Sequence, residues 1–333
     1  MINLLTTHPS WERLLATTPL TDICQPVLLG ETGFSAEGDL VTIAYAGPDV
    51  AMTGITHFLT SLREERRLQW LQTCAAGVEN PLYGALARTG VRVTNSHATS
   101  SAIAEYVLAA VLDHFQRGPE RRSAAGAREW RRLFYREVRG THWLVIGLGA
   151  VGRDVAVRAR AFGARVTAVR QRTTVDPDVD QVIGYSDLLD SVADADVIVV
   201  STALAESTHK LIDREFLARL SPGKTVLVNV ARGEILDEEA LAQSLPRGQP
   251  QLACLDVFPS EPLPVDSWLW NDPRVTVTAH AAALGSGVVA RTDALFLENL
   301  RHFTAGDALL NDVTATLGGS FSRTESPNRE RTT

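Results

Sequence analysis

The chain has 333 residues, of which 45% are hydrophobic and 21% charged, so its composition is that of a globular protein with room for about two domains. The 32 Lys and Arg residues against 39 Asp and Glu residues leave a net charge of −7, which argues against nucleic acid as the main partner. The densest basic stretch, residues 117–139, is interleaved with glutamates, and we expect it to be a solvated helical face.

Neither a membrane segment nor a disulfide framework is expected. No stretch approaches the ~20 mostly apolar residues that span a bilayer, and the first residues lack the features of a secretory signal. Cys24, Cys74 and Cys254 are far apart and form neither a CxxC pair nor a metal-ligand spacing. These features predict reduced, buried thiols in a cytoplasmic protein with no membrane partner.

Short β-rich runs alternate with helical patterns along the chain, which is typical of α/β proteins with parallel sheets. In the first hundred residues, strands are expected at 27–30, 41–46, 68–73 and 91–95. Ile103, Val107 and Val111 recur at helical spacing, so a helix is expected at 99–114. A charged segment, also expected to be helical, then leads to Gly140.

A second series of elements follows. Strands are expected at 143–146, 165–169, 197–201, 225–230, 252–256 and 275–278. Val155 and Ala159 mark the apolar face of a helix that begins at Val151 and stops at Gly163, and a last helix is expected at 288–303.

The fold class expected from this order is α/β, with two Rossmann-like or flavodoxin-like lobes that each contain a parallel sheet. Residues 1–98 form the first lobe, and residues 286–317 return to it because they are too few for a domain of their own. Residues 99–285 form a second lobe inserted into the first. Two crossings between lobes would create a hinged cleft, a common place for a ligand. The tail at 318–333 lacks periodicity and is expected to be disordered.

A glycine-rich turn follows the expected strand at 143–146. Gly147, Gly149 and Gly152 form the pattern GxGxxG between a strand and a helix. The first glycine permits the tight turn, the second lets backbone amides approach a pyrophosphate, and the third lets the helix pack against the strand. The amides of Ala150 and Val151 lie at the helix start, whose partial positive charge attracts phosphate. The second lobe is therefore expected to bind a dinucleotide, with a purely structural turn as the alternative.

The tip of the next strand favours one cofactor over another. An NAD site usually places Asp or Glu about 20 residues after the glycines, where it holds the ribose 2′-hydroxyl. Here Arg170 and Arg172 follow the strand, and no acidic residue appears before Asp176. Two guanidinium groups suit the 2′-phosphate of NADP. We expect NADP(H) to be preferred, with NAD(H) as the second option; the alternative is two arginines that face solvent.

Three more polar residues lie at or beyond the ends of later strands. Arg232 precedes a glycine, and a guanidinium fixed there could grip a planar carboxylate and polarise an adjacent carbonyl. His280 ends a strand, and histidine is the commonest acid or base near neutral pH. Glu261 lies in a loop bracketed by prolines and would favour a charged imidazole beside it. A surface arginine, a satisfied histidine and a loop glutamate are the structural alternatives. No His or Cys stands at ligand spacing from His280, so no metal is expected.

The order of the segments GLGAVG, NVARGEILDEEAL, LDVFPSEPLP and TAH closely resembles the D-isomer-specific 2-hydroxyacid dehydrogenases, most of all their glyoxylate/hydroxypyruvate reductase-like members. The resemblance implies that Arg232 binds the substrate carboxylate and carbonyl, that His280 passes the proton, and that Glu261 is its partner. The implied substrate-binding loop, in the first lobe, is Ala76, Gly77 and Val78. The implied cofactor contacts are Thr202, Val230, Ala231 and Asp256, the last on the nicotinamide carboxamide.

The implied activity is reduction of a small 2-oxo acid to the D-2-hydroxy acid with NAD(P)H, in which hydride reaches C2 and His280 donates the proton. Two family prolines are missing, since Ala279 stands before His280 and Ala203 follows Thr202. Neither change removes a group that performs chemistry. The alternative from another class is a dinucleotide-sensing binding protein, like the C-terminal-binding-protein corepressors on the same scaffold.

The resemblance also implies a homodimer, formed through the helix near 102–114 and the arm that follows it. Trp130 and Tyr135 in that arm are candidate interface anchors, with packing on their own subunit as the alternative. The expected partners are therefore a small 2-oxo or 2-hydroxy acid and a second copy of the chain.

Overall fold

The computed structural model describes residues 1–30, 33–34, 41–63 and 65–318, without the side chains of residues 34 and 51–53. Residues 319–333, which make up most of the expected disordered tail, lie outside the described part. The chain divides into two compact units, Met1–Ala98 with Val289–Thr333, and Thr99–Val288. None of the helices in the described part combines the length and the apolar composition that crossing a bilayer requires.

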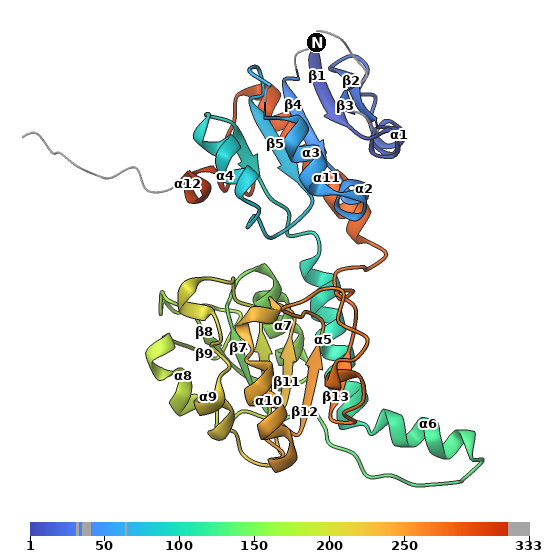
Figure 1. The fold of residues 1–333 in the computed structure, drawn as a ribbon, viewed down its shortest axis with the longest axis vertical. Helices are drawn as coiled ribbons and strands as arrows, with labels where there is room; N and C mark the ends of the chain where they lie inside the picture. The colour runs from blue at the N-terminus through green and yellow to red at the C-terminus, as the bar shows by residue number, and fades with distance from the viewer. Residues whose placement is uncertain (31–32, 35–40, 64, 319–333) are drawn as a thin grey trace, which may run out of the picture. The chain divides into compact units, whose positions relative to one another are not determined.

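The first unit contains a six-stranded sheet in the order β3-β2-β1-β4-β5-β6 (Figure 1). Its strands are β1 (Ile2–Thr6), β2 (Cys24–Gly30), β3 (Gly33–Phe34), β4 (Ile43–Ala46), β5 (Trp70–Thr73) and β6 (Arg92–Thr94). All run parallel except the short β3, which pairs antiparallel with β2 at the edge. Without β3, the strand order is the flavodoxin-like 2-1-3-4-5.

Helices cover both faces of this sheet. They are α1 (His8–Thr17), α2 (Pro48–Thr53), α3 (Ile55–Ser61), α4 (Pro81–Arg88), α11 (Val288–Ala305) and α12 (Thr314–Leu317). Leu5 of β1 packs in a core with Phe58 of α3, whereas the adjacent Leu4 packs in another core with Phe296 of α11. This alternation follows because successive side chains of a strand point to opposite faces. The ring of Phe296 stacks on Trp70 with centroids 5.4 Å apart, which ties α11 to the sheet.

The second unit contains a seven-stranded parallel sheet in the order β9-β8-β7-β10-β11-β12-β13 (Figure 1). Its strands are β7 (His142–Ile146), β8 (Arg165–Val169), β9 (Gln181–Ile183), β10 (Val197–Val200), β11 (Val226–Asn229), β12 (Leu252–Leu255) and β13 (Val275–Val277). Counted from β7, the first six strands follow the doubly wound order 3-2-1-4-5-6 of dinucleotide-binding sheets. The winding reverses between β7 and β10, and ligand sites of α/β sheets form at such a switch point.

Helices also cover both faces of the second sheet. They are α5 (Ser100–Phe115), α7 (Ala150–Ala161), α8 (Leu188–Ser191), α9 (Arg214–Ala218) and α10 (Glu238–Ser244). A further helix, α6 (Gly118–Gly126), follows α5 in the chain. Trp143 of β7 packs in a core with Val155 of α7, while the adjacent Leu144 packs in another core with Phe216 of α9. Burial on both faces explains why these strands are almost entirely apolar in sequence.

The α/β fold class with two parallel-sheet lobes is confirmed, apart from the antiparallel β3. Three strands of the described part, β1, β3 and β9, are not predicted by the sequence patterns. The sequence predicts that the charged segment after α5 is helical up to Gly140, but its helix α6 ends at Gly126. Residues 128–138, which we call the arm, contain no helix or strand. Figure 1 shows α6 and the arm projecting away from the sheet of their unit. All three cysteines are buried free thiols, as expected.

Candidate active site

The glycine turn lies directly after β7, where Gly147 has a positive φ of 95°. A Cβ on Gly147 would lie 2.6 Å from backbone atoms of Thr202, which follows β10, so only glycine fits. A Cβ on Gly152 would overlap the carbonyl oxygen of Gly147, because α7 packs directly on the turn. A Cβ on Gly149 would meet nothing within 4 Å. Protein atoms therefore enclose the first and third glycines and leave space beside the second.

The space beside Gly149 adjoins the N-terminus of α7. Gly149 is the N-cap of this helix and gives it no side-chain hydrogen bond, so the first-turn amides, which include those of Ala150 and Val151, have no side-chain cap. A cavity of about 340 Å³ lies at the ends of β7, β8 and β10. It is lined by Gly147, Leu148, Gly149, Arg170, Gln171, Tyr185, Thr202, Ala203, Ala205, Ser207 and Thr208. A helix N-terminus that opens on a cavity at the switch point is what a pyrophosphate requires, so these residues fit a dinucleotide.

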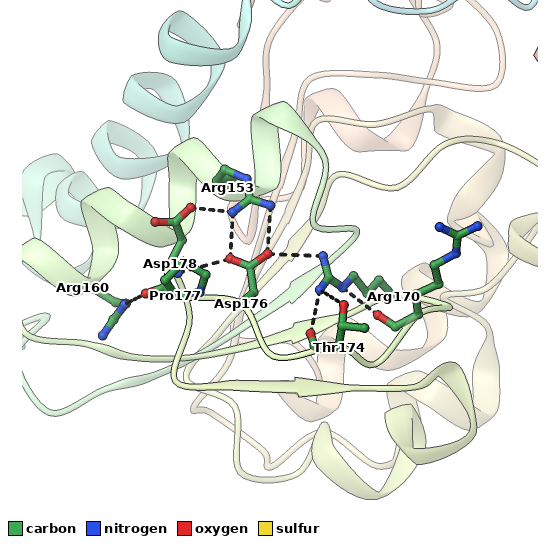
Figure 2. Close-up of polar contacts among 8 residues, drawn as sticks. Arg153, Arg160, Arg170, Thr174, Asp176, Pro177 and Asp178 are labelled. Carbon is green, nitrogen blue, oxygen red and sulfur yellow. Dashed lines mark hydrogen bonds and ion pairs between the residues drawn. The ribbon is translucent and has the colours of Figure 1, made fainter.

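Arg170, which lines this cavity, is held by hydrogen bonds within its own loop (Figure 2). Its Nε donates to the carbonyl of Arg172 at 2.7 Å, and its Nη2 donates to both the carbonyl and the hydroxyl of Thr174. Its Nη1 donates to Oδ2 of Asp176 at 3.3 Å. Four hydrogen bonds thus occupy most of the five N–H groups of this guanidinium.

Asp176 connects Arg170 to α7, as Figure 2 shows. Its carboxylate accepts hydrogen bonds from both Nη atoms of Arg153, at 2.7 and 2.9 Å. The side chain of Asp176 is only 7% exposed, and the hydrogen bonds from Arg153 lower the pKa of its carboxyl group. The two arginines of this loop therefore differ, because Arg170 is tied to Asp176 whereas Arg172 is exposed. Sequence reasoning missed this partner, since Asp176 lies six residues beyond Arg170 in a loop of unpredicted shape.

The turn that carries Arg232 follows β11 and is shaped by the buried Asn229. Nδ2 of Asn229 donates to the carbonyl of Arg232 at 3.0 Å, and its Oδ1 accepts from the amide of Ala231 at 3.1 Å. Nη1 of Arg232 donates to the carbonyl of Ala231 at 2.7 Å. One amide side chain therefore holds the turn at two points. Sequence reasoning missed Asn229, although a polar residue at the end of an apolar strand is the signal that could have found it.

Gly233 packs the Arg232 turn against the loop that carries Glu261. A Cβ on Gly233 would overlap backbone atoms of Phe258 and Pro259. The amide of Phe258 in turn donates to Oε1 of Glu261 at 2.9 Å. The Arg232 turn and the Glu261 loop are therefore in direct backbone contact, and the carboxylate of Glu261 is anchored to the same loop.

His280 follows β13, the neighbour of β12 in the sheet, and its ring contacts Glu261. Nδ1 of His280 lies 2.8 Å from Oε2 of Glu261, and the two side chains are 50% and 36% exposed. Because Oε1 is bonded to Phe258, each oxygen of Glu261 has its own partner. His280 also has a positive φ of 50°, which is uncommon for a residue other than glycine. The structure thus pairs two of the three residues singled out from the sequence.

Asp256, which the resemblance places on the nicotinamide carboxamide, is buried and bonded within the protein. Its carboxylate accepts hydrogen bonds from the amides of Ala281 and Ala282, at 2.9 and 3.0 Å, and from the hydroxyl of Thr278 at 2.5 Å. These partners flank His280 on both sides in the sequence. Asp256 therefore holds the segment after β13, a role that the resemblance does not imply.

The predicted substrate-binding loop lies in the first unit, after β5. Nδ2 of Asn95 donates to the carbonyl of Ala76 at 2.7 Å, and the amide of Ser96 donates to the carbonyl of Ala75 at 3.0 Å. The segment after β6 therefore holds the start of the loop. The assignment of Ala76, Gly77 and Val78 to substrate stays a prediction.

The doubly wound sheet, the enclosed glycine turn and the open helix N-terminus define a dinucleotide-binding α/β protein. Residues 108–282 match the family model described as "D-isomer specific 2-hydroxyacid dehydrogenase, NAD binding domain". The chain belongs to the D-isomer specific 2-hydroxyacid dehydrogenase family, which confirms the resemblance seen in the sequence.

Individual relatives agree with this family. The chain is 32% identical over 240 residues to D-3-phosphoglycerate dehydrogenase of Bacillus subtilis, a match that covers 71% of this chain and 45% of that one. It is 30% identical over 260 residues to glyoxylate/hydroxypyruvate reductase B of Pectobacterium carotovorum, covering 76% of this chain and 81% of that one. The chain therefore spans about half the length of the phosphoglycerate dehydrogenase and most of the reductase.

A solved structure is also similar over nearly the whole chain. It is a D-isomer specific 2-hydroxyacid dehydrogenase from Xanthobacter autotrophicus Py2, crystallised in complex with NADPH and MES. The TM-score is 0.77 at 26% sequence identity, and the match covers 95% of this chain and 99% of that one. The likeness therefore includes both units of the fold.

Proposed function

We propose that this protein is an oxidoreductase that reduces a small 2-oxo acid to the D-2-hydroxy acid with NADP(H). The observation that carries the proposal is the 2.8 Å contact between His280 and Glu261, beside a loop that packs on the Arg232 turn. An imidazole paired with a carboxylate is an acid–base device, and a fixed guanidinium recognises carboxylates. The similarity to a glyoxylate/hydroxypyruvate reductase supports a small substrate of this class.

In this proposal, His280 donates the proton to the C2 oxygen of the substrate. Glu261 accepts from the amide of Phe258 with Oε1, so its other oxygen, Oε2, is positioned for Nδ1 of the imidazole. A hydrogen bond from Nδ1–H to Glu261 fixes the orientation of the ring and leaves Nε2 to carry the transferable proton. Glu261 therefore acts through His280, by fixing the orientation of its ring.

Arg232 binds the substrate carboxylate and stabilises the negative charge that develops on the C2 oxygen. The side chain of Asn229 binds the amide of Ala231 and the carbonyl of Arg232, so the backbone that carries the guanidinium is held in one conformation. The bound nicotinamide cofactor supplies the hydride. This division of labour leaves recognition and charge stabilisation to Arg232 and proton transfer to His280.

NADP(H) is the preferred cofactor in this proposal, and NAD(H) is the weaker one. No acidic residue stands at the tip of β8 to receive a ribose 2′-hydroxyl, and the relative from Xanthobacter autotrophicus was crystallised with NADPH. Arg170 lines the cavity beside the glycine turn but is largely bonded to its own loop. The exposed Arg172 therefore supplies most of the charge for the 2′-phosphate, and Arg170 shapes the loop that carries it.

A second copy of the chain is the proposed protein partner. Trp130 and Phe134 of the arm are 94% and 97% exposed, which is costly for two large apolar side chains in a single subunit. Arg136 anchors the base of the arm, because its guanidinium stacks on Phe115 and donates to the carbonyl of Lys224. A hollow of about 820 Å³ between the arm and the sheet adds further surface that a partner subunit would fill.

Steady-state kinetics test the proposed reaction. The purified protein is assayed with glyoxylate, hydroxypyruvate, pyruvate and bulkier 2-oxo acids, each with NADPH and with NADH. We expect turnover of at least one small 2-oxo acid, with a lower Michaelis constant for NADPH than for NADH. Cofactor binding without turnover of any member of the panel would overturn the proposal in favour of a dinucleotide-sensing protein.

A further inference from the structure

The backbone at His280 needs support from its surroundings. Its φ of 50° lies in the left-handed region, where a side chain other than glycine is strained. Such a conformation persists only where neighbouring groups hold it. Ala279, the preceding residue, has no ring that would restrict the chain on the approach to His280. The groups that hold this conformation must therefore lie outside the segment itself.

Asp256 holds the segment that contains His280 through direct hydrogen bonds. Its carbonyl accepts from the amide of His280 at 2.8 Å, and its carboxylate accepts from the amides of Ala281 and Ala282. Three consecutive amides thus point at one buried residue, whose carboxylate orientation decides where the segment lies. A small rotation of this carboxylate would move the backbone of His280 and, with it, the ring.

Two hydroxyl groups fix the orientation of that carboxylate. Oγ1 of Thr278 lies 2.5 Å from Oδ1 of Asp256, and Oη of Tyr106 lies 2.8 Å from Oγ1 of Thr278. A carboxylate only accepts hydrogen bonds, so the single hydroxyl proton of Thr278 goes to Asp256. The hydroxyl of Tyr106 must then donate to Thr278. Burial raises the pKa of Tyr106 to about 12, which keeps this donor protonated at neutral pH.

We infer that Tyr106, on α5, is a positioning residue for His280 and acts through Thr278 and Asp256. The inference rests on the proposed role of His280 as proton donor. Without the tyrosine hydroxyl, Thr278 loses the donor that fixes its rotamer, so the hydrogen bond from Thr278 to the carboxylate of Asp256 is no longer held in one orientation. A displacement of about 1 Å at a reacting group can slow a reaction by about 10²-fold, so we expect the effect on turnover and not on cofactor binding.

Single-atom substitutions test this chain of hydroxyl groups. Tyr106→Phe removes the terminal donor, Thr278→Val removes the middle hydroxyl at nearly constant volume, and Thr278→Ser retains it as the matched control. We expect kcat to fall roughly tenfold in Tyr106→Phe and in Thr278→Val, with the Michaelis constant for NADPH within about twofold of the parent. Thr278→Ser, which keeps the hydroxyl, should retain most of the parental kcat. The double variant Tyr106→Phe/Thr278→Val should have the same kcat as Thr278→Val alone, because both substitutions interrupt the same chain of hydrogen bonds.

A spectroscopic measurement separates this inference from the proposed reaction. In the cofactor-free protein, the Nδ1–H proton of His280 is expected to give a downfield NMR resonance because of its bond to Glu261, and Tyr106→Phe should shift or broaden it. That result supports the inference even if no 2-oxo acid is turned over. A Tyr106→Phe variant that melts at a lower temperature but keeps the parental kcat and resonance would overturn it. If Tyr106→Phe fails to fold, equal kcat and equal resonances in the valine and serine variants at Thr278 would do the same.

Discussion

Arg153 of α7 and Asp176 of the loop after β8 face each other through two hydrogen bonds, at 2.7 and 2.9 Å. The same carboxylate accepts a third hydrogen bond from Arg170. The helix whose N-terminus opens on the cofactor cavity is therefore tied to the loop that carries the candidate 2′-phosphate arginines. This connection makes the shape of the cofactor site depend on one nearly buried acid.

Replacing Asp176 with asparagine should destabilise the protein in a pH-dependent way. The hydrogen bonds from Arg153 lower the pKa of this carboxyl group in the folded protein. The unfolded value is about 3.9, so the ionised group stabilises the fold above about pH 4, and this contribution is lost as the pH falls through the lowered folded value. We expect Asp176→Asn to lower the melting temperature at pH 7 by about 2–5 °C, with the difference shrinking towards pH 3.

Asp190→Asn is the matched control for that experiment. Asp190 also pairs with an arginine, Arg219, at 3.2 Å, but its side chain is 86% exposed. Exposed ion pairs contribute little because water and salt screen them. Its removal should leave the melting curve nearly unchanged at every pH, and a loss as large as that of Asp176→Asn would show that burial is not what makes the Asp176 pair strong.

Alanine substitutions should distinguish the roles of the two arginines after β8. Arg172→Ala should raise the Michaelis constant for NADPH severalfold and leave the melting temperature unchanged, because Arg172 is exposed. Arg170→Ala should also cost stability, since it breaks the bonds to Thr174 and Asp176. The double variant should raise the constant for NADPH strongly and that for NADH hardly at all. Equal changes for the two cofactors would contradict a 2′-phosphate site.

The sequence predicts the positions of most strands but not their order in the sheets. Hydrophobic runs located most strands, because a strand buried on both faces is almost continuously apolar, as in β10 and β11. The missed β1, Ile2–Thr6, is a mixed run whose strand state depends on its partners β2 and β4, which follow it in the chain. The missed β9 has three residues and pairs with β8 at the edge of the sheet. Pairing between distant segments is not visible in local periodicity.

In the candidate site, too, residues that follow a strand could be located from the sequence, whereas contacts between distant segments could not. Arg232 and His280 could be located because each follows a recognisable strand, and parallel strands bring their carboxyl ends to one edge. The bond from Asp256 to the segment after β13 could not, because it depends on how a loop folds back on a neighbouring strand. The position of Asp176 between two arginines could not be predicted either, because it depends on the path of the loop after β8.

Loss of the proposed proton donor should affect turnover far more than cofactor binding. General acid catalysis contributes about 10²–10⁴-fold, so His280→Ala should lower kcat by that order while the dissociation constant for NADPH stays within about twofold. Glu261→Gln should lower kcat less, because the amide can still contact Nδ1 but carries no charge. Stopped-flow turnover and fluorescence titration of NADPH measure the two quantities, and full activity of His280→Ala would exclude the assigned role.

The three glycines of the turn should respond differently to alanine. Gly147→Ala introduces a clash with the backbone of Thr202 at a positive φ, and Gly152→Ala overlaps the carbonyl of Gly147, so both should unfold the protein at lower temperature. Gly149→Ala meets no protein atom within 4 Å and should keep the parental melting temperature. Its methyl group points into the space proposed for the pyrophosphate, so NADPH affinity should fall at least tenfold by calorimetric titration. An unchanged NADPH affinity in Gly149→Ala would show that the pyrophosphate does not bind at this turn.

The arm gives a prediction about assembly. If Trp130 and Phe134 are anchors of a subunit interface, replacing both with serine removes about 300–500 Å² of apolar contact per subunit from that interface. The folded core of the subunit should be unaffected, because neither side chain is buried in it. We expect the parent to run as a dimer and the double variant as a monomer in light scattering after size-exclusion chromatography. Val175→Ser, which removes a 97% exposed apolar side chain outside the arm, should stay dimeric. A parent that is monomeric at micromolar concentration, or a double variant that remains a dimer, would show that Trp130 and Phe134 do not anchor a subunit interface.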